Sequence, residues 1–511
     1  MPDDLLYHPA FFLFLLSDLF IRHVCTITHI SPYNCMNKTS LMTRRIRSGK
    51  SPNRSKFPRK GRIRLILGII AAAVLLRVFL GAKSGKSETT HGKKTTEIKQ
   101  ASVHTQTDKK KGKPSLPVKK RRGMVEFDDV KAVLKKYPPT RFSINDTLHF
   151  KKESWIVHYS LDTLIQEYGK KLFKRYHPQY GAAVLMEPST GRIKALLSYT
   201  HDSASSIGTD LYCKSIYPAA SIFKTITVAA ALENNLLTPS SCIKLTGRRY
   251  TLYNFQLEEE LSNYKNISLT KAYAYSINPV FGRIGIYITG FQELQEYAHR
   301  FGFGSSVPFE LPVEKSKVLH CDSTFCIAEL ASGFNQKTTL SPLLGALIAS
   351  AITNDGRMPF PRLVDSISDC STGEIRYKPA NSTWREPVKP STAQTIRTMM
   401  SKVTRNGTAR RSFRYMRNSY RFKNVVYGGK TGSVDKDGLG KADWFIGFAS
   451  HNDDPRQRVA VGVVTVHHAN WTVHSSYLGA ELMRRYIRNI QLADERREKL
   501  AKLKEQDEVE G

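Results

Sequence analysis

Cysteine is scarce in this chain, with seven in 511 residues, so a disulfide framework is excluded as its main source of stability. No C-x-x-C pair occurs, and His467, His468 and His474 have no spacing typical of metal ligands. We therefore expect no metal and no other cofactor. The five cysteines beyond residue 200 allow two disulfides and one free thiol, and Cys321 with Cys326 is the favoured local pair.

Acidic residues are missing or rare in two N-terminal segments. Residues 44–64 hold ten Lys or Arg and no acid, and residues 83–122 hold thirteen against three. These segments carry +20 of the formal net charge of +34, so the rest of the chain is only modestly basic. We expect no nucleic-acid partner, because the charge is concentrated outside the part that can fold.

A long hydrophobic run occurs between these basic segments. Leu65 to Ala82 is 18 residues long and apolar apart from Arg77, enough to span about 27 Å as a helix. A buried core helix is the alternative, but it fits poorly with basic flanks on both sides. We predict a single transmembrane helix at 65–82, with the more basic preceding side in the cytoplasm.

The predicted membrane helix divides the rest of the N-terminal region into further segments. Residues 1–41 form a doubtful leader, because Asp3 and Asp4 stand where a signal peptide would be basic. A second membrane segment is one interpretation, and a true initiator at Met36 or Met42 is the favoured one. Residues 42–64 are then a basic cytoplasmic segment, residues 83–122 a disordered tether with a root-mean-square span of about 35 Å, and residues 123–156 a short lead-in.

Three short motifs carry the chemistry of the folded part. They are S-x-x-K at Ser221 to Lys224, S-x-N at Ser276 to Asn278, and K-T-G at Lys430 to Gly432. Single matches carry little weight, because both patterns recur by chance, for example S-x-x-K at Ser241 and Ser262 and S-x-N at Ser143. The K-T-G motif occurs once, so it is the least ambiguous of the three.

The first motif predicts an activated serine. Ser221 begins a run of apolar helix formers, so we expect it at the start of a buried helix. Lys224 then lies one turn away on the same face. Desolvation favours a neutral lysine, which accepts the proton of a nucleophilic serine. The alternative is a serine N-cap followed by an unrelated lysine.

The second and third motifs predict groups that surround this serine. Ser276 and Asn278 precede Pro279, where we expect a loop that aims both side chains at the substrate; simple turn chemistry is the alternative. Lys430 follows Gly428 and Gly429 on what we expect to be an edge strand, or else a bulge. Thr431, Gly432 and Ser433 are the predicted substrate-binding residues, with Lys430 supplying positive charge.

The order of these motifs resembles that of the penicillin-binding proteins and their serine β-lactamase relatives. The resemblance covers residues 157–488 through further segments, which are Ser160 to Gln166, Ala182 to Ile193, Asn406 to Ala409 and Ala442 to Phe448. One departure is Ile222, which stands where the family usually has threonine. The resemblance also implies an oxyanion hole formed by the backbone amides of Ser221 and Ser433.

The implied fold is α+β, with a five-stranded antiparallel sheet flanked by helices and a helical subdomain beside it. The expected domain spans residues 157–490. We expect a hairpin over 181–200, strands at 444–449 and 459–466, and an amphipathic segment from Tyr477 that packs Leu478, Leu482 and Tyr486 on the sheet. Residues 491–511 are expected to form a charged tail.

The implied function is that of a monofunctional peptidoglycan DD-transpeptidase in the bacterial inner membrane, with its catalytic domain outside the cytoplasm. Its partners would be stem peptides, β-lactams as inhibitors and other cell-wall synthesis proteins. No E-x-x-L-N motif lies between Asn278 and Lys430, so rapid hydrolysis of an acylated β-lactam is not expected. The alternatives are a DD-carboxypeptidase, a slow β-lactamase or β-lactam sensor, and a non-catalytic scaffold.

Overall fold

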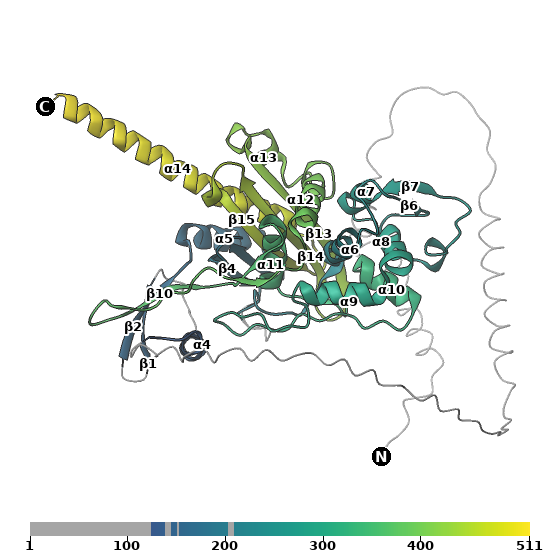
Figure 1. Cartoon of the computed structure of the whole chain (residues 1–511), viewed down its shortest axis with the longest axis horizontal. Coiled ribbons are helices and arrows are strands. Elements are labelled where there is room, and N and C mark those ends of the chain that lie inside the picture. Colours follow the sequence, from purple (N-terminus) through teal and green to yellow (C-terminus); the bar gives the residue numbers. More distant parts are fainter. Residues whose placement is uncertain (1–123, 138–144, 151–152, 203–208, 511) are drawn as a thin grey trace, which may run out of the picture. The chain divides into compact units, whose positions relative to one another are not determined.

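The structure, a computed structural model, describes residues 124–137, 145–150, 153–202 and 209–510 (Figure 1). The predicted leader, membrane helix and tether lie outside these residues. Within the described ranges, no helix combines the length and the apolar character that membrane crossing requires.

A five-stranded antiparallel sheet forms the centre of the fold, with the strand order β13-β14-β15-β3-β4. Its strands are β3 (Tyr180–Met186), β4 (Ile193–Thr200), β13 (Val425–Lys436), β14 (Gly440–His451) and β15 (Arg458–His467). Valine is frequent in β15, which is buried along nearly its whole length, as expected for a strand covered on both faces. The predicted hairpin is confirmed as β3 paired with β4, and the two predicted strands lie within β14 and β15.

Helices pack on this sheet. They include α5 (Thr163–Tyr176), α11 (Pro342–Thr353) and α14 (Ser475–Glu510). The strongly apolar α11 is buried at every position. Leu478, Leu482 and Tyr486 of α14 are buried as predicted, whereas its C-terminal part extends away from the sheet (Figure 1).

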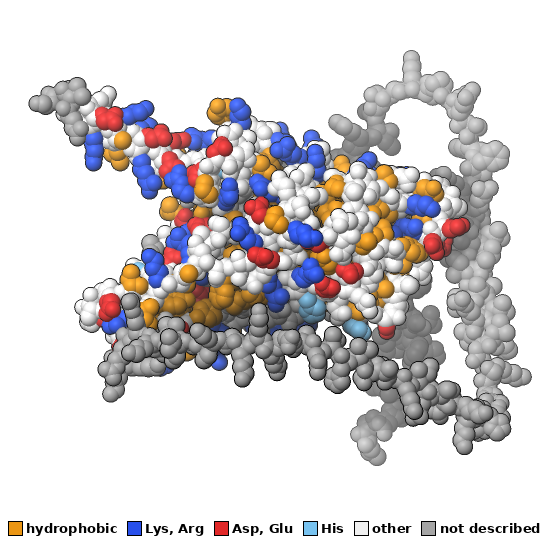
Figure 2. Space-filling model, in the orientation of Figure 1, with side chains coloured by type: hydrophobic (Ala, Val, Ile, Leu, Met, Phe, Trp, Pro, Cys, Tyr) orange, Lys and Arg blue, Asp and Glu red, His pale blue; other side chains and the backbone are white. Residues whose placement is uncertain are grey.

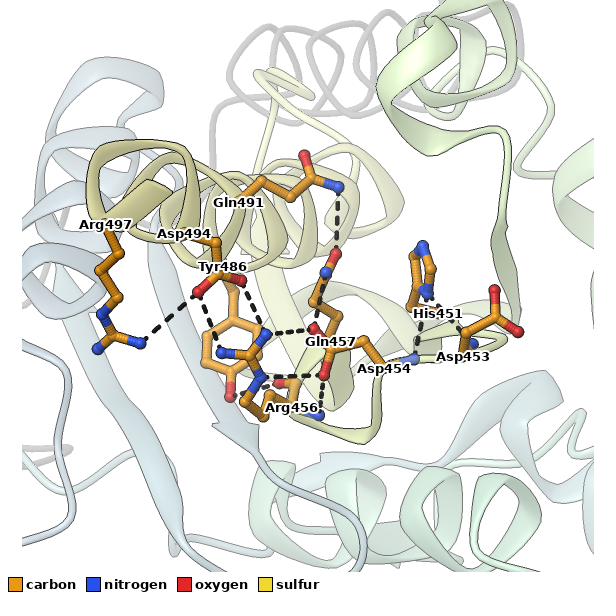
Figure 3. A network of polar contacts seen from close by, with 9 residues as sticks. All are labelled: His451, Asp453, Asp454, Arg456, Gln457, Tyr486, Gln491, Asp494 and Arg497. Carbon is orange, nitrogen blue, oxygen red and sulfur yellow. Dashed lines mark hydrogen bonds and ion pairs between the residues drawn. The ribbon is translucent and has the colours of Figure 1, made fainter. Parts of the chain in front are cut away.

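A polar network supports α14 near the point where its exposed part begins (Figure 3). Arg456, in the 3₁₀ turn η5 (Pro455–Gln457), forms ion pairs of 2.9 Å with Asp454 and 2.8 Å with Asp494 of α14. Gln491 donates a hydrogen bond of 3.1 Å to Gln457. The loop before β15 is thereby connected to the helix.

A helical subdomain lies beside the β13 edge of the sheet (Figure 1). Its helices are α6 (Lys224–Glu233), α7 (Leu269–Ala274), α8 (Asn278–Ile284), α9 (Gly290–Arg300) and α10 (Thr324–Ser332), with a π-helical turn η3 (Gly285–Thr289) and a 3₁₀ turn η2 (Asn254–Gln256). The strand pair β6 (Cys242–Leu245) and β7 (Lys265–Ser268) also belongs to it. Helix α12 (Pro390–Arg405) contacts both α7 and β13 and so connects the subdomain to the sheet.

A second sheet has the order β1-β2-β10-β11. It consists of β1 (Asn145–Phe150), β2 (Glu153–Tyr159), β10 (Val364–Asp369) and β11 (Ile375–Tyr377), preceded by α4 (Phe127–Lys136). The predicted lead-in therefore holds ordered elements, and the boundary predicted at residue 157 falls inside β2. The remaining short elements are β5 (Tyr217–Pro218) with β8 (Thr339–Leu340), β9 (Met358–Pro359) with β12 (Thr383–Arg385), α13 (Arg414–Asn418) and η4 (Tyr420–Phe422).

One of the two disulfides that the sequence allows is present in the described residues. It joins Cys321 to Cys326, as predicted. Cys213, Cys242 and Cys370 are free thiols, so the second bridge is not formed.

Candidate active site

Ser221 lies in a 3₁₀ turn, η1 (Ala220–Phe223), that leads directly into α6. Ser221 therefore lies at the start of a buried helical segment, as predicted, although its first turn is 3₁₀ and the α-helix begins at Lys224. In a 3₁₀ turn the side chains at i and i+3 are eclipsed. This geometry places Lys224 Nζ 2.8 Å from Ser221 Oγ.

Lys224 is completely buried, whereas Ser221 is partly exposed. The ammonium lies 2.7 Å from Asn278 Oδ1, and it also donates to the backbone carbonyl of Ser332. Burial, followed by the positive charge of Lys430, lowers the pKa of Lys224 well below its usual value. The amine is therefore suited to accept a proton from Ser221.

Ser276 and Asn278 follow the end of α7. Ser276 has φ +56°, a left-handed conformation that is uncommon for a residue with a side chain. Asn278 is the first residue of α8 with Pro279 next to it, so the prediction of a loop holds for Ser276 but is wrong for Asn278. The Asn278 amide donates 3.2 Å to the Tyr250 carbonyl, which orients its oxygen toward Lys224.

Lys430 belongs to β13, which is the edge strand that the sequence predicts. Its Nζ lies 2.9 Å from Ser276 Oγ and 2.7 Å from the carbonyl of Thr431. Burial lowers the pKa of Lys430 to about 7. The hydroxyl of Ser276 is therefore in contact with Lys430.

Gly432 brings β13 against the turn that holds Ser221. A Cβ at Gly432 would lie 3.0 Å from the Ser221 backbone nitrogen and 3.2 Å from the Cβ of Ala220. Of the other predicted substrate-binding residues, Ser433 is exposed and Thr431 is partly buried, with its Oγ1 2.5 Å from Thr408 Oγ1. The three motifs thus meet around Ser221.

Sequence reasoning missed two contributors to this arrangement. Ser332 acts through its backbone carbonyl, which leaves no signature in the sequence. Gly333, at the C-terminus of α10, has φ +66°, and a Cβ there would lie 1.9 Å from the carbonyl oxygen of Ala220. A glycine after a helical run is a recognisable C-terminal signal, although it does not reveal what the helix end contacts.

The arrangement of a serine, two buried lysines and an edge strand is typical of proteins that have a Ser-Lys acyl-transfer site. The family model of the penicillin binding protein transpeptidase domain matches residues 181–485. The chain belongs to this family, which confirms the resemblance found in the sequence.

Curated relatives support this assignment. Peptidoglycan D,D-transpeptidase PbpA of Mycobacterium tuberculosis is 32% identical over 220 residues, which are 38% of this chain and 44% of the relative. Stage V sporulation protein D of Bacillus subtilis is 27% identical over 311 residues, which are 57% of this chain and 46% of that protein. The chain thus spans about half the length of these relatives.

A solved structure supports the predicted α+β fold. Penicillin-binding protein A from M. tuberculosis, as a ceftriaxone acyl-enzyme complex, has a TM-score of 0.53 and 25% identity to this chain. The match covers 65% of this chain and 79% of that chain.

Proposed function

We propose that this protein is a peptidoglycan DD-transpeptidase that acts through an acyl-enzyme on Ser221. The observation that carries the proposal is the buried Lys224 amine, 2.8 Å from Ser221 Oγ. Two further lines of support are the membership in the transpeptidase domain family and the mycobacterial relatives named peptidoglycan D,D-transpeptidase.

The proposed first half-reaction forms an ester. Ser221 Oγ bonds to the carbonyl carbon of the penultimate D-alanine while Lys224 takes the hydroxyl proton. The peptide C–N bond then breaks, and the terminal D-alanine leaves as an amine after it receives a proton. In the second half-reaction an amine of another stem peptide attacks the ester, forms a new peptide bond and returns the proton to Ser221.

The surrounding residues have distinct proposed roles. Asn278 orients Lys224, and Ser276 relays the proton that Lys224 took from Ser221 to the leaving amine, while Lys430 holds the Ser276 hydroxyl in place. Thr431, Gly432 and Ser433 bind the substrate along the edge strand, where Lys430 attracts its terminal carboxylate. The backbone amides of Ser221 and Ser433 stabilise the oxyanion.

The cellular setting is also part of the proposal. A helix at 65–82 would anchor the protein in the cytoplasmic membrane, and the tether at 83–122 would let the catalytic domain reach the wall on the outer side. The support is the apolar run with basic flanks in the sequence. β-Lactams would act as inhibitors, and other cell-wall synthesis proteins would be partners.

Labelling with a fluorescent penicillin tests the nucleophile. We expect stable labelling of the full chain and none of the Ser221→Ala variant. Ser262→Ala is a matched control, because exposed Ser262 begins another S-x-x-K sequence. Labelling that survives in Ser221→Ala, or is absent from the folded wild type, would contradict the proposed acyl-enzyme; absence from the wild type would favour the scaffold.

Product analysis tests the acceptor. With uncross-linked stem-peptide substrates, a transpeptidase yields dimers, whereas a DD-carboxypeptidase yields trimmed monomers only. Steady turnover of nitrocefin would instead identify a β-lactamase.

A further inference from the structure

A cationic segment lies next to the candidate site and takes no part in the chemistry proposed above. Residues 397–423 contain no acidic residue. Their basic residues are Arg397, Lys402, Arg405, Arg410, Arg411, Arg414, Arg417, Arg421 and Lys423. All of these side chains except Arg397 are exposed. We call this the basic surface; its Lys and Arg side chains are seen over α12 and α13 in Figure 2.

Little of this charge is neutralised by the protein itself. Among the residues that the structure describes, Arg421 is the one member that forms an ion pair, at 2.6 Å from Glu495. Burial and the neighbouring Arg458 lower the pKa of Arg397, against a smaller opposing effect of Asp355. The surface therefore presents a positive field that an anion would complement.

Two of the hollows on this surface are lined without any acidic side chain, whereas a third contains Arg421 and Lys423 together with Asp494, Glu495 and Glu498. The first has a volume of about 350 Å³ and contains Arg397, Lys402 and Arg405. The second has a volume of about 610 Å³ and contains Arg405, Arg417 and Lys423. Because Arg405 lines both, the hollows are adjacent positions on one surface. This arrangement suits an extended ligand with repeated anionic groups.

The basic surface is directly connected to the edge strand of the candidate site. Thr408 lies between Arg405 and Arg410 in the chain, and its Oγ1 is 2.5 Å from Thr431 Oγ1 of β13. Its backbone nitrogen donates 3.1 Å to the carbonyl of Ala274, two residues before Ser276. A polymer bound on the basic surface would therefore lie beside the strand that carries Lys430.

We propose that the basic surface binds the carboxylates of peptidoglycan stem peptides and so holds a glycan strand beside the acyl-transfer site. This inference rests on the proposed function, since it assigns a second contact to the same substrate. Arginine suits carboxylate because its planar guanidinium binds both oxygens. Neighbouring stem peptides on one strand supply the repeated anionic groups that adjacent hollows require.

The test measures binding without acyl transfer, in full-length protein carrying Ser221→Ala. The ligand is a soluble uncross-linked glycan strand with stem peptides, compared with the same strand after amidation of its carboxylates. We expect Lys402→Glu with Arg405→Glu to weaken binding at least about tenfold and to flatten its salt dependence. The matched control is Lys171→Glu with Lys174→Glu, which reverses two exposed lysines on α5.

The outcomes separate this inference from the proposed function. Equal binding by both double variants, or equal binding of native and amidated strands, overturns it. Tighter binding to polyphosphate, to phosphatidylglycerol vesicles or to an oligonucleotide overturns it as well and identifies a different polyanion. The unfolding midpoint of each variant verifies that it folds. The acyl-enzyme is judged separately by penicillin labelling of protein with an intact Ser221.

Discussion

At the scale of single residues, Lys224 and Lys430 share an unusual electrostatic condition. Both amines are fully buried, and burial lowers the pKa of each. The positive charge of Lys430 lowers the pKa of Lys224 further. Lys430 carries a proton up to about pH 7, and burial beside that positive charge favours the neutral form of Lys224.

Replacement of Lys224 tests its role as a proton acceptor. We expect Lys224→Met to lower the second-order rate constant of penicillin acylation by about 10²- to 10⁴-fold, as is typical for loss of a general base. Lys271→Ala is the control, since Lys271 is exposed on α7. A rate within tenfold of the wild type, in a variant with an unchanged unfolding midpoint, would show that another group takes the proton.

The pH dependence of acylation tests the pairing of the two lysines. The rate constant for a β-lactam with a carboxylate is expected to rise as Lys224 loses its proton. It should fall above about pH 7, because Lys430 then loses the positive charge that attracts the carboxylate. In Lys430→Gln the rate should be lower and the falling limb absent. A falling limb that persists in this variant would assign it to a different group.

At the scale of elements, the position of Ser221 depends on backbone contacts from α10 and β13. Gly333 ends α10 against the carbonyl of Ala220, and Gly432 on β13 faces the Ser221 nitrogen. Neither contact leaves room for a Cβ without movement. The turn that holds the nucleophile is therefore fixed from two sides by glycine.

A pair of glycine substitutions separates this contact from backbone strain. Gly333 and Gly373 have similar positive φ values, +66° and +71°, but a Cβ on Gly373 would meet nothing within 4 Å. We expect Gly373→Ala to destabilise the protein by about 1 kcal/mol without affecting acylation. Gly333→Ala should destabilise it more and slow acylation at least about tenfold. Equal effects on acylation in the two variants would exclude a role for the contact with Ala220.

The elements that are encoded locally could be predicted from the sequence, whereas the contacts between distant motifs could not. The spacing of Ser221 and Lys224 predicts their proximity, which an α-helix and a 3₁₀ turn both produce. The edge strand with Lys430 was also predictable from its glycines. By contrast, the contact of Lys430 with Ser276 joins residues 154 positions apart, and no periodic pattern encodes such a pairing.

At the scale of the whole molecule, Glu310 connects the loop after α9 to the second sheet. Its carboxylate accepts hydrogen bonds of 2.9 Å from the backbone nitrogen of Leu363 and 3.0 Å from that of Val364, where β10 begins. Burial raises the pKa of Glu310 from 4.5 to about 7 and outweighs the opposing effect of these hydrogen bonds. The folded state therefore binds this proton more tightly than the unfolded state does.

The free energy of unfolding should depend on pH because of this proton. Because folding raises the pKa of Glu310, protonation of this residue stabilises the folded state fully below about pH 4.5. This stabilisation is lost as pH rises through about 7. The contribution is on the order of 3 kcal/mol. Denaturation at several pH values should show this component in the wild type and in the exposed control Glu260→Gln, but not in Glu310→Gln. Identical pH profiles for wild type and Glu310→Gln would refute the assignment.

The second sheet could not be predicted from the sequence. The central sheet and its helices were expected from the family resemblance and from Val-rich strands such as β15. Strand β2 pairs with β10, more than 200 residues later, so it gave no local sign of its partner and was placed partly in the lead-in. Strand pairing across such separations depends on the packing of the entire domain.

The lowered pKa values of the two buried amines also mean that the site can gain or lose protons as its surroundings change. In the described residues, no carboxylate contacts Lys224 or Lys430, so the site lacks an anion of its own. A bound carboxylate would supply that anion and favour the charged form of Lys430. Near neutral pH, the binding of such a ligand would therefore be coupled to the uptake of a proton by Lys430, and a lower pH would favour that binding.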